Sequence, residues 1–424
     1  FYYNGFMILL HNISQLLTLS GGPQRGHALG NLSIMPDAAV LIDGERITAV
    51  GSSADLLSAY PSAELFDAHG CVVMPGFVDP HTHLVWAGDR AAEFELRLQG
   101  KTYMEIMAAG GGILSTLKAT RAASLEQLVE QSHQRAMQAF NYGTTTLEAK
   151  TGYGLDIETE IKQLQAILEL NKMGPLQLIP TFMGAHAIPP EFKGDAPGYT
   201  RFLCKEALPA VKSWWQEHAP HQSLPFVDVF CEVGAFDLAQ TRTILERSQL
   251  LGFPLKLHVD EFENLGGASL AAELGAASAD HMVKTSLEDI QQMADSDTVA
   301  VSLPGTPFGL AQNQYTPAKA IIEADGLLAL ASDLNPGTTW NESMQFIIAL
   351  ACRYMGLTPA QAIAAVTINA AAAIQLEDQV GSIEAGKQAD LLVLNMPDYR
   401  HLGYRYGTNL VSYIFKRGKL FSIG

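Results

Sequence analysis

Short apolar runs alternate with helical stretches through the middle of this chain, and this alternation restricts the folds open to it. Eight runs have β character: "GFVDPHTH", "GTTTLEA", "LQLIPTF", "FVDVFCE", "PLKLHVD", "AASADHM", "TVAVSLP" and "LLALASD". Amphipathic or alanine-rich segments such as "SLEQLVEQSHQRAMQAF" and "ESMQFIIALACRYMG" accompany them. A repeated strand–helix pattern favours a parallel sheet covered by helices. Eight such units predict a distorted TIM (β/α)8 barrel, with an open doubly wound α/β sheet as the alternative.

Both ends of the chain are rich in strands instead. "AAVLIDGERITAVG" alternates apolar residues on both sides of Asp43-Gly44, a dipeptide typical of a tight hairpin turn. "ADLLVLNM" and "LVSYIFKRGKLFSI" are further short β segments, the second with a turn at Arg417-Gly418. Because 424 residues exceed the usual size of one core, we expect a large barrel with an appended domain, or two to three smaller domains.

The charge balance narrows the class of partner. Lys and Arg number 27 against 44 Asp and Glu, a net charge of -17, which disfavours nucleic acid and anionic membranes. The four cysteines form no C-x-x-C pair, and "GFMILLHN" is too short to span a bilayer. We therefore expect a soluble cytoplasmic protein with a small-molecule ligand, and an anionic ligand would need a local cation.

Polar residues gather where the predicted barrel strands end. Histidines or acids follow the first, third, fifth, sixth and eighth runs: His81 and His83, His186, His258 with Asp260 and Glu261, Asp280 with His281, and Asp333. In a TIM barrel the chemistry lies at these strand ends. Three His and one Asp suit Zn²⁺ or a similar first-row ion, with one position left for water. Such an ion lowers the pKa of water from 15.7 to about 7, which makes hydrolysis the natural chemistry.

The blocks "PGFVDPHTH", "KLHVDEF", "SADHM" and "ASDLNPG", in this order, resemble the amidohydrolase superfamily, in its metal-dependent cyclic-amidase and deaminase branch. "HTHLVWAGDRAAEFELRLQGKTYMEIMAAGGGI", "TTTLEAKTGYGLD" and "TFMGAHAIPPE" are similar to the members that open an imidazolone ring in histidine degradation. The similarity covers nearly the whole chain. It implies a β-sandwich built from residues 1–73 plus 381–424 and a barrel of residues 74–380. A homodimer is a further expectation from the family.

The resemblance also implies a reaction and a site. The reaction is hydrolysis of 4-imidazolone-5-propanoate to N-formimidoyl-L-glutamate, with one zinc or iron ion held by His81, His83, His258 and Asp333. Glu261 and His281 are the implied acid/base pair. The residues implied around the substrate are Arg90, Tyr153, His186, Glu261, Asn335, Gly337 and Thr338, with Tyr103 as a further candidate. Lys150 is expected to be an ordinary ammonium group and not a carbamylated bridge between two ions.

Other interpretations stay open at this point. Taken alone, His258 could be a core histidine, Asp333 could cap a loop, and Arg90 could be a solvated surface charge. A deaminase of a nucleobase-like ring would keep the same metal ligands but release ammonia. A catalytically silent barrel that binds a small ligand would be favoured by a missing ligand or a missing Glu261, and the sequence has all of them.

Overall fold

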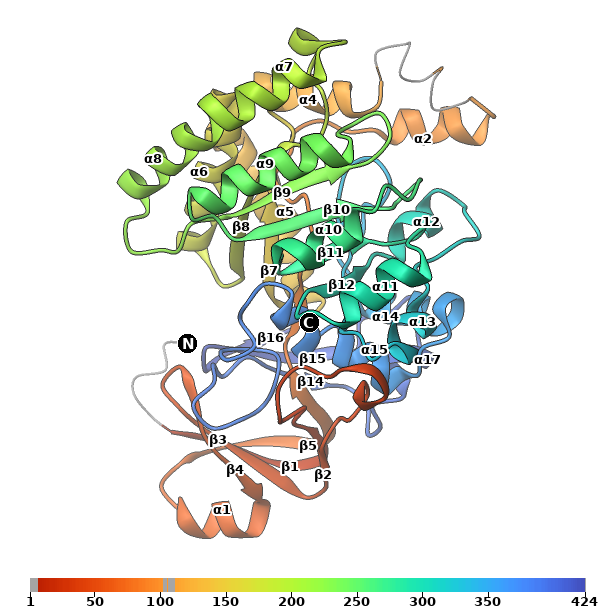
Figure 1. Cartoon of the computed structure of the whole chain (residues 1–424). Coiled ribbons are helices and arrows are strands. Elements are labelled where there is room, and N and C mark those ends of the chain that lie inside the picture. Colours follow the sequence, from red (N-terminus) through yellow and green to blue (C-terminus); the bar gives the residue numbers. More distant parts are fainter. Residues whose placement is uncertain (1–6, 102–104, 106–110, 424) are drawn as a thin grey trace.

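The larger part of the molecule is a parallel sheet whose eight strands follow one another in chain order (Figure 1). The computed structural model describes residues 7–101, 105 and 111–423. The strands are β6 (Phe77–Asp79), β7 (Thr144–Lys150), β8 (Gln177–Ala185), β9 (Phe226–Cys231), β10 (Leu255–Val259), β11 (Ser278–His281), β12 (Val299–Ser302) and β13 (Leu328–Leu330). All eight predicted strands are therefore confirmed.

The first and last strands of this sheet meet just beyond their carboxyl ends. Thr82 forms a parallel bridge with Leu334, and the His83 amide donates to the Leu334 carbonyl at 2.9 Å. The Asp333 amide donates to the His81 carbonyl at 3.1 Å. This contact nearly closes the sheet, which confirms the barrel and excludes the open doubly wound alternative. The closing contact also brings the end of β6 beside the residues that follow β13.

Helices lie around the barrel. They are α2 (Ala91–Leu98), α4 (Ile113–Ala122), α5 (Leu125–Asn141), α6 (Ile157–Met173), α7 (Ala196–Phe202), α8 (Leu208–His218), α9 (Leu238–Leu250), α10 (Gly267–Leu274), α11 (Leu287–Ala294), α12 (Gly305–Gly309), α13 (Ala318–Glu323), α14 (Met344–Leu350), α15 (Pro359–Ala365), α16 (Ile368–Ala372) and α17 (His401–Tyr404). Helix α5 begins with a capping box between Ser124 and Gln127. Its buried face includes Leu128 and Phe140, which pack in the main core.

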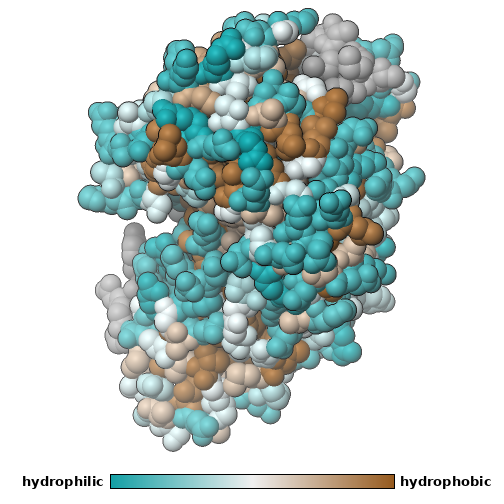
Figure 2. All heavy atoms as spheres, viewed as in Figure 1, coloured by the Kyte–Doolittle hydropathy of each residue, from teal (hydrophilic) through white to brown (hydrophobic). Residues whose placement is uncertain are grey.

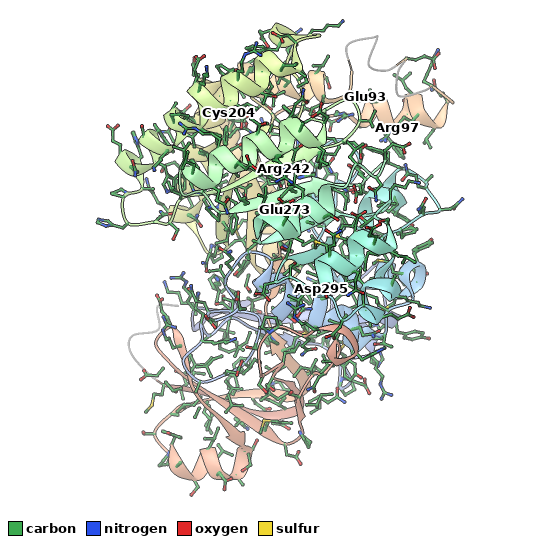
Figure 3. The ribbon with its side chains drawn as sticks, in the orientation of Figure 1. Glu93, Arg97, Cys204, Arg242, Glu273 and Asp295 are labelled. Carbon is green, nitrogen blue, oxygen red and sulfur yellow. The ribbon has the colours of Figure 1, made fainter. Side chains whose placement is uncertain are left out.

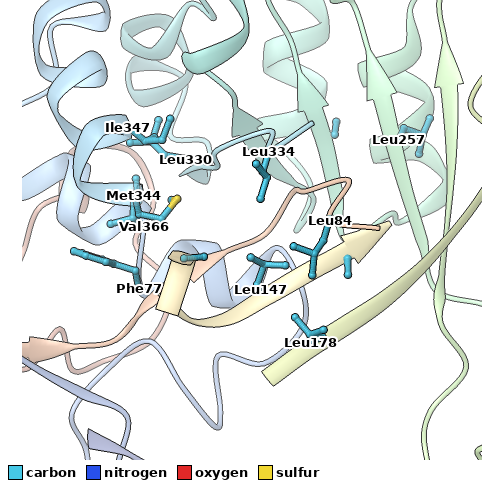
Figure 4. Close-up of a cluster of buried hydrophobic side chains, with 14 of the residues drawn as sticks. Phe77, Leu84, Leu147, Leu178, Leu257, Leu330, Leu334, Met344, Ile347 and Val366 are labelled. Carbon is cyan, nitrogen blue, oxygen red and sulfur yellow. The ribbon is translucent and has the colours of Figure 1, made fainter. Parts of the chain in front are cut away.

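The barrel core is a continuous set of side chains from strands and helices. Figure 4 shows Phe77, Leu147 and Leu178 from neighbouring strands, with Ile347 and Val366 from the region after the last strand. Strand residues of a parallel barrel are covered on both faces, which is why the eight runs read as apolar stretches and not as strict alternation. Hydrophilic residues cover most of the molecular face in Figure 2.

A second, mixed sheet is built from both ends of the chain, in the order β16-β15-β14-β5-β1-β3-β4 with β2 against β1. Its strands are β1 (Ile8–Leu17), β2 (Ile34–Met35), β3 (Ala38–Asp43), β4 (Arg46–Ser52), β5 (Glu64–Pro75), β14 (Leu391–Leu394), β15 (Val411–Lys416) and β16 (Lys419–Ser422), with α1 (Ser53–Ala59) after β4. Leu10 and Val40 share one apolar cluster with Leu391 and Phe415. The two halves of the sheet therefore cover a common core, as predicted for a sandwich built from both ends.

Details at the sequence-predicted turns and boundaries differ slightly. Asp43 pairs with Arg46, so the turn residues of the first hairpin are Gly44 and Glu45, one position later than predicted. Arg417 and Gly418 form the predicted second turn, with φ of 47° and 72°. Strand β5 continues to Pro75, past residue 73, and the domain boundaries stay a prediction. None of the helices in the described part of the chain has the length and apolar character needed to cross a bilayer.

Candidate active site

The four predicted metal ligands converge at the closing contact of the barrel. Asp333 Oδ1 lies 3.6 Å from His81 Nε2 and 3.7 Å from His83 Nε2. His83 Nε2 lies 3.3 Å from His258 Nε2. All four side chains are buried, and His81 Nε2 has no hydrogen-bond partner among the described residues. Because buried nitrogens normally have a partner, this group of facing donor atoms fits a cation bound between them.

The backbone at the strand ends is unusual. Asp260, His281, Met282 and Asp333 are non-glycine residues with φ of 54°, 78°, 56° and 52°. This left-handed region is uncommon for residues with a side chain and is concentrated at functional sites. The chain therefore turns sharply where β10, β11 and β13 end, and the turn residues include a predicted ligand and a predicted proton-transfer group.

Carboxylates behind the histidines orient two of the rings. His81 Nδ1–H donates to Asp280 Oδ2 at 2.6 Å, and His258 Nδ1–H donates to Asp228 Oδ2 at 3.0 Å. These contacts place the proton on Nδ1 and leave the Nε2 lone pair free to face the centre of the site. Burial lowers the pKa of His81 and His83 well below the usual value, which favours the neutral imidazole that a metal requires.

Glu261 and His281 lie side by side next to this group. His281 Nε2 is 3.7 Å from Glu261 Oε2. His281 is also close enough to His81 and His258 for their ring nitrogens to share one ion. Burial, followed by the charge of Asp333, raises the pKa of Glu261 well above its usual value. A raised pKa means that this carboxyl group holds a proton more readily, as a group that accepts and returns a proton requires.

Arg90 is held at the rim by the residues around it. Its Nε donates to Glu93 Oε2 at 2.9 Å, and Glu93 also accepts from the Gly112 amide and the Ser115 hydroxyl. A Cβ on Gly337 would lie 2.4 Å from Arg90 Nη1, so the guanidinium packs in the space that glycine leaves. Glu93 therefore fixes the plane of the Arg90 guanidinium and connects it to the start of α4.

The loop after Asp333 is shaped by its own side chains. Asn335 Oδ1 accepts from the amides of Gly337 and Thr338, and its Nδ2 donates to the Asp333 carbonyl at 2.7 Å. Arg97 Nη2 adds a hydrogen bond to the Gly337 carbonyl at 3.1 Å. Figure 3 labels Arg97 and Glu93 on α2, at the edge of the barrel. This loop is therefore fixed from within and from α2, next to the predicted metal ligand.

Two aromatic residues cover another side of the metal ligands. The His186 ring stacks on His83 with centroids 4.8 Å apart, and the Tyr153 ring lies 5.8 Å from His83. Burial lowers the pKa of His186 to about 3, so this ring is neutral. Glu160 accepts hydrogen bonds from three backbone amides of residues 152–155 and so holds the Tyr153 loop. Tyr103 lies outside the described residues.

Several of these residues were not anticipated from the sequence. Glu93 and Arg97 sit on a helix, where their charges look solvated. Asp228 and Lys256, which are both fully buried, interrupt the apolar runs "FVDVFCE" and "PLKLHVD". Charged residues are almost never fully buried unless they are paired, so a charge within a buried strand was an available signal for a polar network inside the barrel.

A nearly closed (β/α)8 barrel with histidine and aspartate donors at its strand ends defines a metal-dependent hydrolase of the amidohydrolase class. Residues 64–141 and 249–420 match models described as the amidohydrolase family, and residues 38–63 match an imidazolonepropionase-like composite domain of bacteria. An imidazolonepropionase of Herpetosiphon aurantiacus is 52% identical over 97% of this chain and 96% of that protein. One of Symbiobacterium thermophilum is 48% identical with the same coverage. The chain belongs to the imidazolonepropionase family.

Solved structures agree on the fold at much lower identity. An adenosine deaminase of Xanthomonas campestris with bound zinc aligns with a TM-score of 0.70 at 18% identity, over 97% of this chain and 92% of that one. A 5-methylcytosine deaminase of Klebsiella pneumoniae aligns with a TM-score of 0.72 at 16% identity, over 97% of each chain. These similarities support the barrel with its terminal sheet and leave the substrate to other arguments.

Proposed function

We propose that this chain hydrolyses 4-imidazolone-5-propanoate to N-formimidoyl-L-glutamate in histidine degradation, using one zinc or iron ion. The proposed ligands are His81, His83, His258 and Asp333. The observation that carries the metal site is the buried His81 Nε2, which has no hydrogen-bond partner in the described part of the chain and lies 3.6 Å from Asp333 Oδ1. Imidazole and carboxylate ligands accept both zinc and iron. The free cysteines fit the reducing cytoplasm, and a homodimer stays a prediction.

The bound ion would supply a water of lowered pKa and polarise the ring carbonyl. Glu261 accepts a proton from the attacking water at its carboxylate. As the carbonyl carbon gains the water oxygen, the ring C–N bond breaks and Glu261 returns the proton to the leaving nitrogen. His281, 3.7 Å from Glu261, donates a hydrogen bond toward the carbonyl oxygen as negative charge develops there. The products of these steps are the new carboxylate and the opened formimidoyl group.

The remaining side chains orient the substrate. Arg90 binds the propanoate carboxylate, because its planar guanidinium can donate to both oxygens and its plane is already fixed by Glu93. The Tyr153 hydroxyl and neutral His186 assist from the side of His83. Asn335, Gly337 and Thr338 form the opposite wall, with Asn335 acting through the shape of its loop.

The test is a product assay with the metal-loaded protein. Incubation with 4-imidazolone-5-propanoate is expected to give N-formimidoyl-L-glutamate without release of ammonia. Metal analysis of the same sample is expected to return one ion per chain. Absence of turnover on the imidazolone, together with ammonia release from a nucleobase, would replace this function by deamination.

A further inference from the structure

A cluster of charges lies inside the barrel directly behind the metal ligands, and none of its members takes part in the reaction above. It contains three carboxylates and two lysines, all with 0% exposure: Glu148, Asp228, Asp280, Lys150 and Lys256. Lys150 Nζ lies 2.8 Å from Glu148 Oε1 and 2.7 Å from Asp228 Oδ2. Lys256 Nζ lies 3.2 Å from Glu148 Oε2 and donates to the Pro80 carbonyl at 2.7 Å.

This cluster is joined to the metal ligands through single oxygen atoms. Asp228 Oδ2, which binds Lys150, is the same atom that accepts from His258 Nδ1. Asp280 Oδ2, which accepts from His81 Nδ1, lies 3.7 Å from both lysine nitrogens. Each of these two histidines is therefore connected to an ammonium group by one carboxylate.

The charges of this arrangement are complementary to one divalent ion. Counted at their formal charges, three carboxylates and two ammonium groups sum to one negative charge, and Asp333 adds a second one beside the metal ligands. Buried charges that water does not reach must be balanced by opposite charges, because an unpaired buried charge is strongly unfavourable. Burial acts to lower the pKa of Lys150, but Asp228, Glu148 and Asp280 outweigh it and the net pKa is raised, so the lysine stays charged.

The same carboxylates could otherwise attract a second metal. Donor atoms of His81, Glu148 and Asp280 lie within 4.8 Å of one another, which is close enough for one ion. The ammonium groups of Lys150 and Lys256 already contact two of these side chains. The two ammonium groups therefore occupy the carboxylate contacts that a second metal ion would need.

We infer that Lys150 and Lys256 are positioning residues of the metal centre: their contacts fix the orientation of the Asp228 and Asp280 carboxyl groups, which accept from Nδ1 of His258 and His81 and so direct Nε2 of both rings toward a single ion. The inference rests on the proposed function only in taking these histidines as metal ligands. It adds two lysines and two aspartates to the residues that determine metal affinity and number. Loss of such outer contacts typically lowers metal affinity by about 10- to 100-fold.

The experiment measures zinc affinity by chelator competition, without substrate, on the metal-free parent and on Lys150→Met and Lys256→Met. Methionine keeps much of the side-chain volume and removes the charge. We expect a zinc Kd about 10- to 100-fold weaker in both variants. Lys172→Met is the matched control, because Lys172 is exposed on α6 and pairs only with Glu169 among the described residues; its Kd should equal the parent's.

Circular dichroism and thermal unfolding of the metal-free proteins separate positioning from folding. Folded variants with a lowered Tm and an unchanged zinc Kd would overturn the inference, as would two zinc ions per parent chain. If the lysine variants do not fold, Asp280→Asn provides the test, because it keeps the side-chain shape and both lysines. This variant should also weaken zinc binding. An unchanged zinc Kd of Asp280→Asn would refute the inference. A parent that binds zinc as expected but does not open the imidazolone would refute the proposed function alone.

Discussion

Replacement of Arg90 by alanine tests how a chain with a net charge of -17 selects an anionic substrate. The Arg90 side chain is only 15% exposed, Glu93 holds its Nε, and Gly337 leaves room for Nη1. Truncating one member of a buried, hydrogen-bonded charge pair costs about 2–5 kcal/mol. At about 1.4 kcal/mol for each factor of ten, Arg90→Ala should lower kcat/KM at least about thirtyfold. Arg90→Lys keeps the charge but loses the planar fork, so its loss should be intermediate.

The assay compares 4-imidazolone-5-propanoate with an analogue in which an amide replaces the propanoate carboxylate. We expect the Arg90→Ala loss on the natural substrate to exceed the loss on the analogue by far, with metal content unchanged. Arg242→Ala is the control, because Arg242 forms an exposed ion pair with Glu273 on the outer helices, where both are labelled in Figure 3. Equal losses on both substrates, or loss of the metal, would show that Arg90 supports the structure and does not bind the carboxylate.

Three further perturbations probe the same site. Glu261→Gln should keep the metal and lower kcat by about 10²–10⁴-fold, and activity near the parent's would contradict its role in proton transfer. Dialysis against a chelator should abolish turnover, and one equivalent of zinc or ferrous iron should restore it; a requirement for two equivalents would show a binuclear site. Gly337→Ala should raise KM for the imidazolone, because the new Cβ displaces Arg90 Nη1. The expected loss of substrate binding energy is about 1–3 kcal/mol. An unchanged KM would show that the position of the guanidinium is unimportant.

The barrel could be predicted because its signal is local. The eight strands are short apolar runs that alternate with helices along the chain. The histidines lie at or just after the carboxyl ends of these runs. Once the strands close into a barrel, the meeting of His81, His83 and Asp333 follows from the contact between the first and last strands. The prediction of convergence therefore required only the strand count and the rule that chemistry lies at the carboxyl ends.

Contacts between distant segments could not be predicted in the same way. Glu93 stands on an exposed helix, three residues from Arg90, and only the fold brings it to the Gly112 amide and the Ser115 hydroxyl. Asn335 was expected beside the substrate, yet its described hydrogen bonds serve its own loop, because a short polar side chain readily pairs with nearby amides. Its contact with substrate stays a prediction. The first hairpin turn was predicted at Asp43 and Gly44, but the structure has it one residue later, at Gly44 and Glu45.

Strand β5 joins the two parts of the molecule, and its pairing determines when each part can be completed during synthesis. Its parallel partner β1 precedes it, but its antiparallel partner β14 is translated only after the whole barrel. Until then one edge of β5 has unpaired backbone groups, and the first barrel strand, β6, begins two residues further on. Such an edge is a template for pairing with other chains, so the nascent protein should be most prone to aggregate just before residues 391–394 leave the ribosome.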